Sequence, residues 1–441
     1  MTQRKISSET TMTRKYLTTL VGVCLLLTGA CSSAEGGDGG DDTITYWSQW
    51  EKDEPQAAVL EDAIESFTAE TGIEVEVEWQ GRQVLQKVRP LLRSGDVPDL
   101  VDSSSSAIRA TLVSADAARD LSAVFEAEVP GENATVGEVL GDYGSLITAD
   151  SLDGPFMLPT ITLAYSFFYD GASHPELAES PPQTWPDFMA MLQGLKVARG
   201  SGPVAVDGDI GAYLGVWTSN ALINELGEGG FSELIADETG EAWRSPQVAA
   251  ALEQIAQLPA DDVWAEGSFG SKFPQIQERW AAGESDILLM GSWAPQETKN
   301  STTGNFEYRQ FAFPEGSAGQ FTQSDVTGFA IPTDAEHPEQ AEQFLAWLTR
   351  KDVMTALTQD ALQLVTRMDL EAPPDIADTK RIMEETSVVR VYDGVDGDYP
   401  GYVTEVFEPI NKQLMTGEIT PETMVDQLVS AQADYWARQG Q

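Results

Sequence analysis

The segment of residues 43–102 alternates between strand and helix patterns, and this alternation limits the possible folds more than any other feature of the chain. Its predicted elements are a strand at 43–47, a helix at 55–71, a strand at 73–79, a helix at 84–94 and a strand at 100–101. The first helix begins at Pro55 and ends before Gly72, and the strand 73–79 alternates apolar residues with glutamates, as an edge strand does. This order of elements predicts a parallel sheet with helices on its faces.

Polar and aromatic side chains follow the ends of these three strands. Ligands of parallel sheets bind beyond the carboxyl ends of the strands, so we expect these side chains to meet on one rim. The candidate ligand-binding residues on this rim are Trp47, Trp50, Gln80, Arg82 and Asp102.

A second set of elements is predicted from Phe156 onward. Strands at 156–158 and 163–169 are expected to cross into it. The remaining predicted elements are strands at 204–206, 287–290 and 326–331 and helices starting at 185 and spanning 213–226, 246–258, 274–282, 338–349, 403–414 and 421–436. The candidate ligand-binding residues in this part are Asp207, Asp209, Trp217, Lys272 and Trp293.

These residue types suit a sugar. A pyranose presents C–H groups on its faces and hydroxyls around its edge, so it favours flat aromatic walls with carboxylates, amides and guanidinium groups at the perimeter. Each candidate also has a structural interpretation: the tryptophans can pack in a core, the aspartates can cap helices or form turns, and Arg82 and Lys272 can pair with nearby acids.

The sequence supports an enzymatic function less well than it supports sugar binding. The only histidines, His174 and His337, each precede Pro-Glu and are typical of helix starts, so no Ser-His-Asp set is expected. We find no phosphate-binding glycine loop and no match to a calcium loop, and we expect no cofactor and no metal. The alternatives that stay open are a lipid-anchored glycosidase with paired carboxylates, a purely structural surface lipoprotein and a binding protein for a non-sugar solute.

The amino-terminal residues predict an extracytoplasmic location. Residues 1–30 have the charged and short apolar regions of a signal peptide, and Leu27–Cys31 resembles the lipobox of bacterial lipoproteins, in which the cysteine is diacylated. Residues 31–42 are rich in Gly and Asp and are expected to be a flexible tether. We therefore expect Cys31 to anchor the protein to the outer face of the bacterial cytoplasmic membrane, and the other cysteine, Cys24, to leave with the signal.

The charge of the chain excludes some partners. The sequence holds 71 Asp and Glu against 26 Lys and Arg, for a formal net charge of -45. Such a surface repels nucleic acid and anionic lipid headgroups, so contact with the membrane is expected only through the lipid anchor. The length of 441 residues is enough for two domains.

Several stretches, taken in order, resemble a known family. They are residues 43–50, 71–75, 95–100, 283–293, 328–332 and the helix after His337-Pro338. In these stretches the chain is similar to the extracellular solute-binding proteins of ABC importers, in the sugar-binding group that includes maltodextrin-binding proteins.

The resemblance implies two α/β lobes, each a mainly parallel sheet flanked by helices, joined by a hinge that the chain crosses three times. Lobe 1 would comprise residues 43–155 and 326–366, and lobe 2 residues 156–325 and 367–441. A monomer of this kind would bind a solute, here a neutral sugar or oligosaccharide, between the lobes and deliver it to ABC permease subunits. Gly328 in a matching stretch and Asp393 in the tail 390–402 are further expected ligand contacts.

Overall fold

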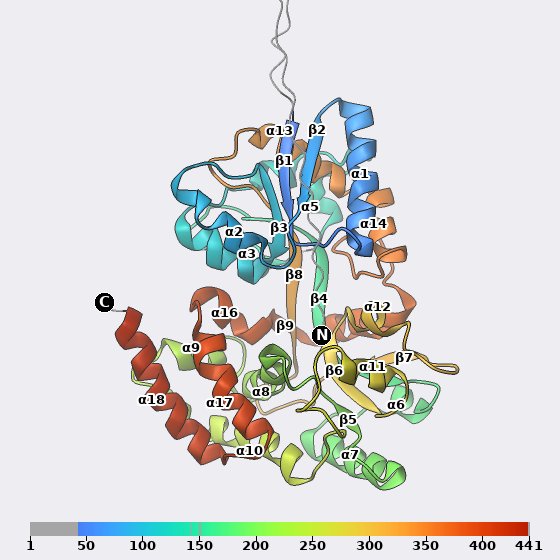
Figure 1. The fold of residues 1–441 in the computed structure, drawn as a ribbon, viewed down its shortest axis with the longest axis vertical. Coiled ribbons are helices and arrows are strands. Elements are labelled where there is room, and N and C mark those ends of the chain that lie inside the picture. Colours follow the sequence, from blue (N-terminus) through green and yellow to red (C-terminus); the bar gives the residue numbers. More distant parts are fainter. Residues whose placement is uncertain (1–42, 142, 150, 440–441) are drawn as a thin grey trace, which may run out of the picture. The chain divides into compact units, whose positions relative to one another are not determined.

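The computed structural model describes residues 43–141, 143–149 and 151–439, which form a nine-stranded sheet flanked by helices (Figure 1). The strands are β1 (Thr43–Ser48), β2 (Glu74–Trp79), β3 (Leu100–Ser104), β4 (Leu158–Asp170), β5 (Val204–Ala205), β6 (Ile287–Gly291), β7 (Tyr308–Phe311), β8 (Phe321–Ala330) and β9 (Ser387–Arg390). Their order is β2-β1-β3-β8-β4-β6-β5, with β7 paired to β4 and β9 to β8.

The predicted arrangement of residues 43–102 is confirmed. Strand β1 pairs in parallel with β2 and β3, and β2 stands at the edge of the sheet. Helix α1 (Pro55–Thr71) begins with Pro55 and ends at Gly72, whose φ of 80° is the left-handed conformation that glycine adopts without a steric cost.

Two long strands connect two separate hydrophobic cores. On β4, Leu158 and Ile161 pack in one core, whereas Phe167 and Tyr169 pack in the other. On β8, Phe329 lies in the first core and Phe321 packs against the second. The cores define two lobes, so the chain has the predicted two-lobed α/β fold. The pairs β1–β2, β1–β3, β5–β6 and β8–β9 are parallel, whereas β4 pairs antiparallel with β6, β7 and β8.

Three strand predictions differ from the structure. The expected strands 156–158 and 163–169 are one strand, β4, whose register shifts between Pro159 and Ile161 because proline has no N–H to donate. Strand β8 begins five residues before the predicted start at Val326. Strands β7 and β9 were not predicted, since four residues are too short for a clear alternation.

Helices pack against the sheet in both lobes, and helix α1 has been described above. In the first half of the chain they are α2 (Val84–Val88), α3 (Ser105–Thr111), α4 (Ser122–Glu126), α5 (Val136–Val139), α6 (Pro175–Glu179), α7 (Trp185–Arg199) and α8 (Gly211–Leu226). In the second half they are α9 (Gly230–Ala236), α10 (Pro246–Ala260), α11 (Gln275–Ala281), α12 (Ala294–Thr298), α13 (Pro338–Leu348), α14 (Lys351–Gln359), α15 (Ala377–Glu385), α16 (Val395–Asp398), α17 (Glu408–Met415) and α18 (Pro421–Gln439).

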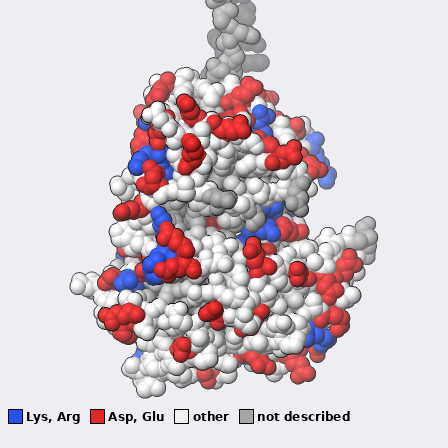
Figure 2. Space-filling view, turned by 180° about the vertical axis from the view of Figure 1, so that it is seen from behind, with Lys and Arg blue, Asp and Glu red and all other residues white. Residues whose placement is uncertain are grey.

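The predicted signal peptide, tether and lipidated Cys31 lie outside the described residues. In residues 43–141, 143–149 and 151–439, no helix has the length and apolarity needed to cross a membrane. Acidic side chains spread over the surface seen from behind, with fewer basic ones among them (Figure 2).

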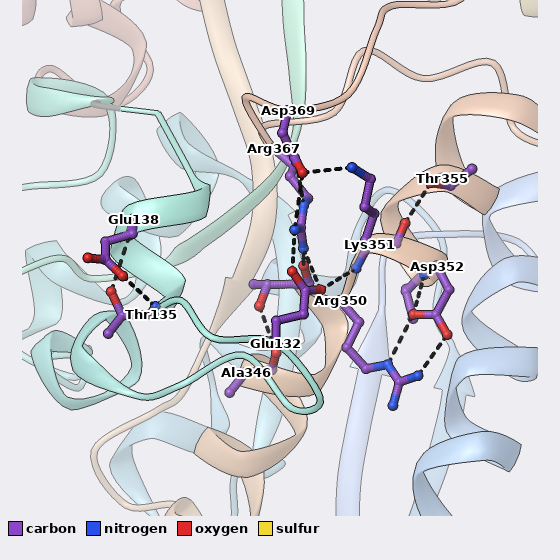
Figure 3. Close-up of polar contacts among 12 residues, drawn as sticks. Glu132, Thr135, Glu138, Ala346, Arg350, Lys351, Asp352, Thr355, Arg367 and Asp369 are labelled. Carbon is purple, nitrogen blue, oxygen red and sulfur yellow. Dashed lines mark hydrogen bonds and ion pairs between the residues drawn. The ribbon is translucent and has the colours of Figure 1, made fainter.

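A buried arginine, Arg367, fixes the chain where it crosses between the two cores for the third time. Arg367 is 3% exposed and donates hydrogen bonds to Glu132, to Asp369 and to the carbonyl oxygen of Thr349 (Figure 3). The backbone N–H of Lys351 donates to Glu132, and the Lys351 ammonium donates to Asp369, each at 2.9 Å. This network ties the segment after Val365 to the start of α14.

Candidate functional site

The carboxyl ends of β1, β2 and β3 meet on one rim, as predicted for parallel strands. Asp102 accepts a hydrogen bond from the backbone N–H of Gln49 (2.9 Å), and Arg82 donates to the carbonyl oxygen of Gln49 (2.7 Å). The Arg82 guanidinium lies 4.6 Å from the centre of the Trp50 ring and donates two hydrogen bonds to Glu54, at 2.9 and 2.5 Å. The structure thus brings Trp50, Arg82 and Asp102 together. Glu54 was missed, although its place just before Pro55 puts it at the same loop.

The carboxyl group of Asp102 is buried, and burial raises its pKa to about 6. Among the described residues, its second oxygen has no hydrogen-bond partner, and neither has the side-chain amide nitrogen of Gln49. A buried polar atom without a partner costs free energy, so these two atoms are suited to further hydrogen bonds.

The other two predicted residues of this rim lie to its sides. Gln80 accepts a hydrogen bond from Lys87 (2.7 Å) and donates one to Glu78 (2.6 Å). The ring of Trp47 is half-buried and packs against the hydrophobic cluster around Val84.

Four aromatic side chains form the facing surface of lobe 2, which we call the aromatic wall: Tyr165, Tyr213, Phe273 and Trp293. Trp293 follows β6, and its ring lies over Gly291, where a Cβ would come within 1.9 Å of it. The Trp293 ring meets Tyr165 edge-on at 5.4 Å and Tyr213 at 6.5 Å, and Tyr213 meets Phe273 at 6.0 Å. Only Trp293 was predicted, because the two tyrosines and Phe273 come from a strand, a helix and a loop far apart in the sequence.

Two of the three predicted aspartates of lobe 2, Asp207 and Asp209, hold the loop that carries Phe273. Asp209 accepts a hydrogen bond from the backbone N–H of Phe273 (3.1 Å) and lies 3.6 Å from the ammonium of Lys272. Asp207 accepts from the backbone N–H of Ile276 (3.2 Å) at the start of α11, and burial raises its pKa to about 6. The structure therefore brings Asp207, Asp209 and Lys272 together, where they position the aromatic wall.

Glu297 of lobe 2 interacts electrostatically with charged residues on the rim of lobe 1. It lies on α12, accepts a hydrogen bond from the Gln277 amide (2.7 Å), and is close enough to Arg82 and Glu54 of lobe 1 to interact with both. Burial raises the pKa of Glu297, while Gln277 and Arg82 act to lower it. The rim of lobe 1 and the aromatic wall of lobe 2 consequently face the same space.

Three other predicted ligand contacts have structural roles. Trp217 is fully buried and packs edge-on against Phe167 and Trp264, at 5.1 and 5.3 Å. Gly328 lies between β3 and β4, where a Cβ would come within 2.0 Å of the carbonyl oxygen of Leu158. Asp393 is 5% exposed and accepts hydrogen bonds from three backbone N–H groups at the start of α9.

Three carboxyl groups from different elements lie close enough to interact with one another, and one of them, Asp325, also interacts with Tyr165 of the aromatic wall. They are Asp325 on β8, Asp396 on α16 and Glu408 on α17. Burial is the main cause that raises the pKa of each, and the charge of Asp325 adds to the effect on Asp396. For Glu408, burial together with the charge of Asp396 raises the pKa to about 7. In the described part of the chain, no group of three or more His, Cys, Asp or Glu side chains is placed to hold a metal ion.

The raised pKa of Glu408 predicts a pH dependence of stability. Between the ordinary glutamate pKa near 4.5 and about 7, the folded state holds this proton and the unfolded state does not, so the free energy of unfolding falls as pH rises through that range. Glu408→Gln should raise the free energy of unfolding by about 1–3 kcal/mol at pH 8 and change it little at pH 4. Urea unfolding at both pH values measures this difference.

Glu405→Gln is the matched control, because Glu405 is exposed and lies one turn before Glu408. A stabilisation by Glu408→Gln that is the same at pH 4 and pH 8 would contradict the assignment.

Comparison with known proteins gives a family match. The profile of the family described as bacterial extracellular solute-binding protein matches residues 50–355. The diacetylchitobiose binding protein NgcE of Streptomyces coelicolor is 22% identical over 228 residues, which are 51% of this chain and 47% of that protein. The match therefore spans about half the length of this curated relative.

Solved structures of solute-binding proteins have the same fold. RafE of Streptococcus pneumoniae, in its apo form, is 18% identical and superposes with a TM-score of 0.72 over 89% of this chain and 97% of RafE. RafE in complex with raffinose gives a TM-score of 0.70. The MsmE binding protein of Bacillus subtilis, in an open conformation, is 14% identical with a TM-score of 0.74 over 92% of this chain and all of that chain. These similarities show the two-lobed fold.

Proposed function

Because this chain belongs to the bacterial extracellular solute-binding proteins, we propose that it captures a neutral sugar or oligosaccharide between its lobes and delivers it to an ABC permease. The observation that carries the proposal is the aromatic wall, with Trp293 at its centre, opposite the Trp50–Arg82–Glu54 group. The proposed ligands agree in class with those named for relatives: diacetylchitobiose for NgcE and raffinose for RafE.

Each surface supplies a different part of sugar recognition. The C–H face of a pyranose would lie against Trp293 and its neighbouring tyrosines, where apolar surface is removed from water. The hydroxyls around the ring would exchange hydrogen bonds with Glu297, Arg82 and Glu54.

We propose that the hinge consists of β4, β8 and the segment between Val365, in the core of lobe 1, and Ile376, in a cluster of lobe 2. Lobe 1 is then 43–155 and 326–366, and lobe 2 is 156–325 and 367–441, except that β4 up to Ile161 still packs in the core of lobe 1. A closed form would contact a solute on both sides, which an open form cannot do, so binding favours closure.

A thermal-shift screen of purified protein against neutral mono- and oligosaccharides tests this function. We expect at least one sugar to raise the melting temperature, because a ligand at 100 times its dissociation constant adds about 2.7 kcal/mol to the stability of the folded state. A response only to amino acids, peptides or polyamines would refute the sugar assignment. Release of shortened glycans during incubation would show an enzyme instead of a binding protein.

We also propose that Cys31 carries the lipid that holds a monomeric protein at the outer face of the cytoplasmic membrane. The proposal rests on the sequence Leu27–Cys31, the short apolar region before it and the polar residues after it. Cys31→Ser should move the protein from the membrane fraction into the medium, measured by immunoblot of both fractions. Cys24→Ser is the control and should leave it on the membrane. Retention of the Cys31→Ser protein on the membrane would contradict the anchor.

A further inference from the structure

An unusual left-handed turn precedes α16. Tyr392 and Asp393 have φ angles of 52° and 55°, and Gly394 follows with 83°. Left-handed backbone is unfavourable for residues with a Cβ, and two such residues in succession persist only where the surrounding structure holds them. Such outliers concentrate at functional sites, so the turn calls for a functional explanation.

Lobe 2 holds this turn firmly. The backbone N–H of Tyr392 donates to the side-chain oxygen of Gln323 (2.7 Å), and its hydroxyl donates to the carbonyl oxygen of Ala212 (2.9 Å). Asp393 accepts three backbone hydrogen bonds at the start of α9. Gly394 has a φ of 83°, and the guanidinium of Arg390 lies where a Cβ would be, so both features favour glycine at this position.

The turn directs α16 against α3, which belongs to lobe 1 (Figure 1). A Cβ at Gly397 would lie 3.1 Å from the Arg109 side chain and 3.4 Å from the carbonyl oxygen of Ser106. Asp398 accepts two hydrogen bonds from Arg390, at 3.2 and 2.6 Å, and lies 4.0 Å from Arg109. Short-range packing and charge therefore join the lobes at this point.

The start of α3 is in turn fixed to the long strand β8. Ser105 and Ser106 both donate hydrogen bonds to the buried carboxyl group of Asp325. The start of α3 is thus tied to the proposed hinge strand β8, and α16 is held by the left-handed turn of lobe 2. Movement of the lobes about the hinge would therefore change the contact between the two helices.

We propose that α16 is an interlobe latch: its contact with α3, made through Gly397 and Asp398, stabilises the arrangement of the lobes in which the two helices touch. The proposal rests on the hinge movement of the proposed function but not on the identity of the solute. The left-handed turn is explained by this role, because it aims a four-residue helix of lobe 2 at Arg109 of lobe 1.

Distances between two spin labels test the latch. The full chain with Cys24→Ser and Cys31→Ser contains no other cysteine, so Asp53→Cys and Asn300→Cys add one exposed label site before α1 and one after α12. In the absence of any sugar, Gly397→Leu should lower about tenfold the population with the label distance of the unsubstituted protein relative to other distances, because a leucine does not fit against Arg109. Gly194→Leu is the matched control, since a Cβ at Gly194 meets nothing within 4 Å, and it should leave the distances unchanged.

Arg109→Met tests the same contact from lobe 1 and should shift the distances in the same direction. If the Gly397→Leu protein does not unfold cooperatively on heating, the label distances in the Arg109→Met protein alone test the latch. Distance distributions that match the unsubstituted protein in the folded variants would overturn the latch. A sugar screen without any response would refute the proposed solute and leave this measurement unaffected.

Discussion

Trp293→Ala is expected to weaken sugar binding roughly 30-fold, which corresponds to a loss of about 2 kcal/mol. Trp293 joins Tyr165 and Tyr213 into one surface and is only half-buried, so part of its ring is open to a ligand. Its removal would take away the largest apolar face of the proposed site. Isothermal titration calorimetry with the sugar that gives the largest thermal shift measures the effect, and Trp293→Phe should restore most of the affinity.

Trp436→Ala provides the comparison for Trp293→Ala. Trp436 is also half-buried and in lobe 2, but its indole N–H donates to the carbonyl oxygen of Ile235 and its ring packs against Tyr399 and Tyr435. This substitution should lower stability and leave the affinity within about twofold, the effect of a few tenths of a kcal/mol. Equal losses of affinity in the two variants would refute the proposed site.

Arg367→Met is expected to lower the free energy of unfolding by about 3 kcal/mol at pH 7, because it leaves the partly buried carboxylate of Glu132 without its partner. Hydrogen bonds from Arg367 hold the pKa of Asp369 at about 2 and keep the pKa of Glu132 below its usual value. Because both pKa values are lowered, these carboxylates stabilise the folded state at any pH above the ordinary carboxyl pKa. This contribution to the free energy of unfolding is lost as the pH falls toward 2. The effect of Arg367→Met should therefore shrink with acidification.

Urea unfolding at pH 7 and pH 3 measures this effect, with Arg381→Met as the control. The Arg381 side chain is 50% exposed and pairs with Asp378 and Glu385 on its own helix, so its removal should cost less than about 1 kcal/mol. If the two arginine variants are equally stable at pH 7, the network around Arg367 does not carry the stability assigned to it.

The sequence predicted the rim of lobe 1 well, because that rim is encoded locally. Strand and helix periodicities identified the three parallel strands, and the geometry of parallel sheets places their ends together. Trp50, Arg82 and Asp102 do meet there. Glu54 was missed because 71 acidic residues make any one carboxylate uninformative until a partner for it is known.

The aromatic wall was predicted poorly, because its members meet only in the folded chain. Tyr165 belongs to a strand, Tyr213 to the first turn of a helix and Phe273 to a loop, and each also suits a core position. Trp217 shows the reverse case, a residue that was expected to bind ligand from its sequence but is fully buried in the structure. Burial depends on which helix face meets which strand, and a single sequence does not specify this.

The sequence by itself determined the class of the fold, the acidic surface and the order of the elements along the chain, since these follow from composition and from periodicities over a few residues. Only the tertiary structure decided which side chains share a surface and which glycine positions allow close contact. It also decided how Arg367 and the left-handed turn at Tyr392 are held. These features depend on contacts between segments far apart in the sequence, such as that between Arg367 and Glu132, which are 235 residues apart, and periodicities over a few residues do not encode such contacts.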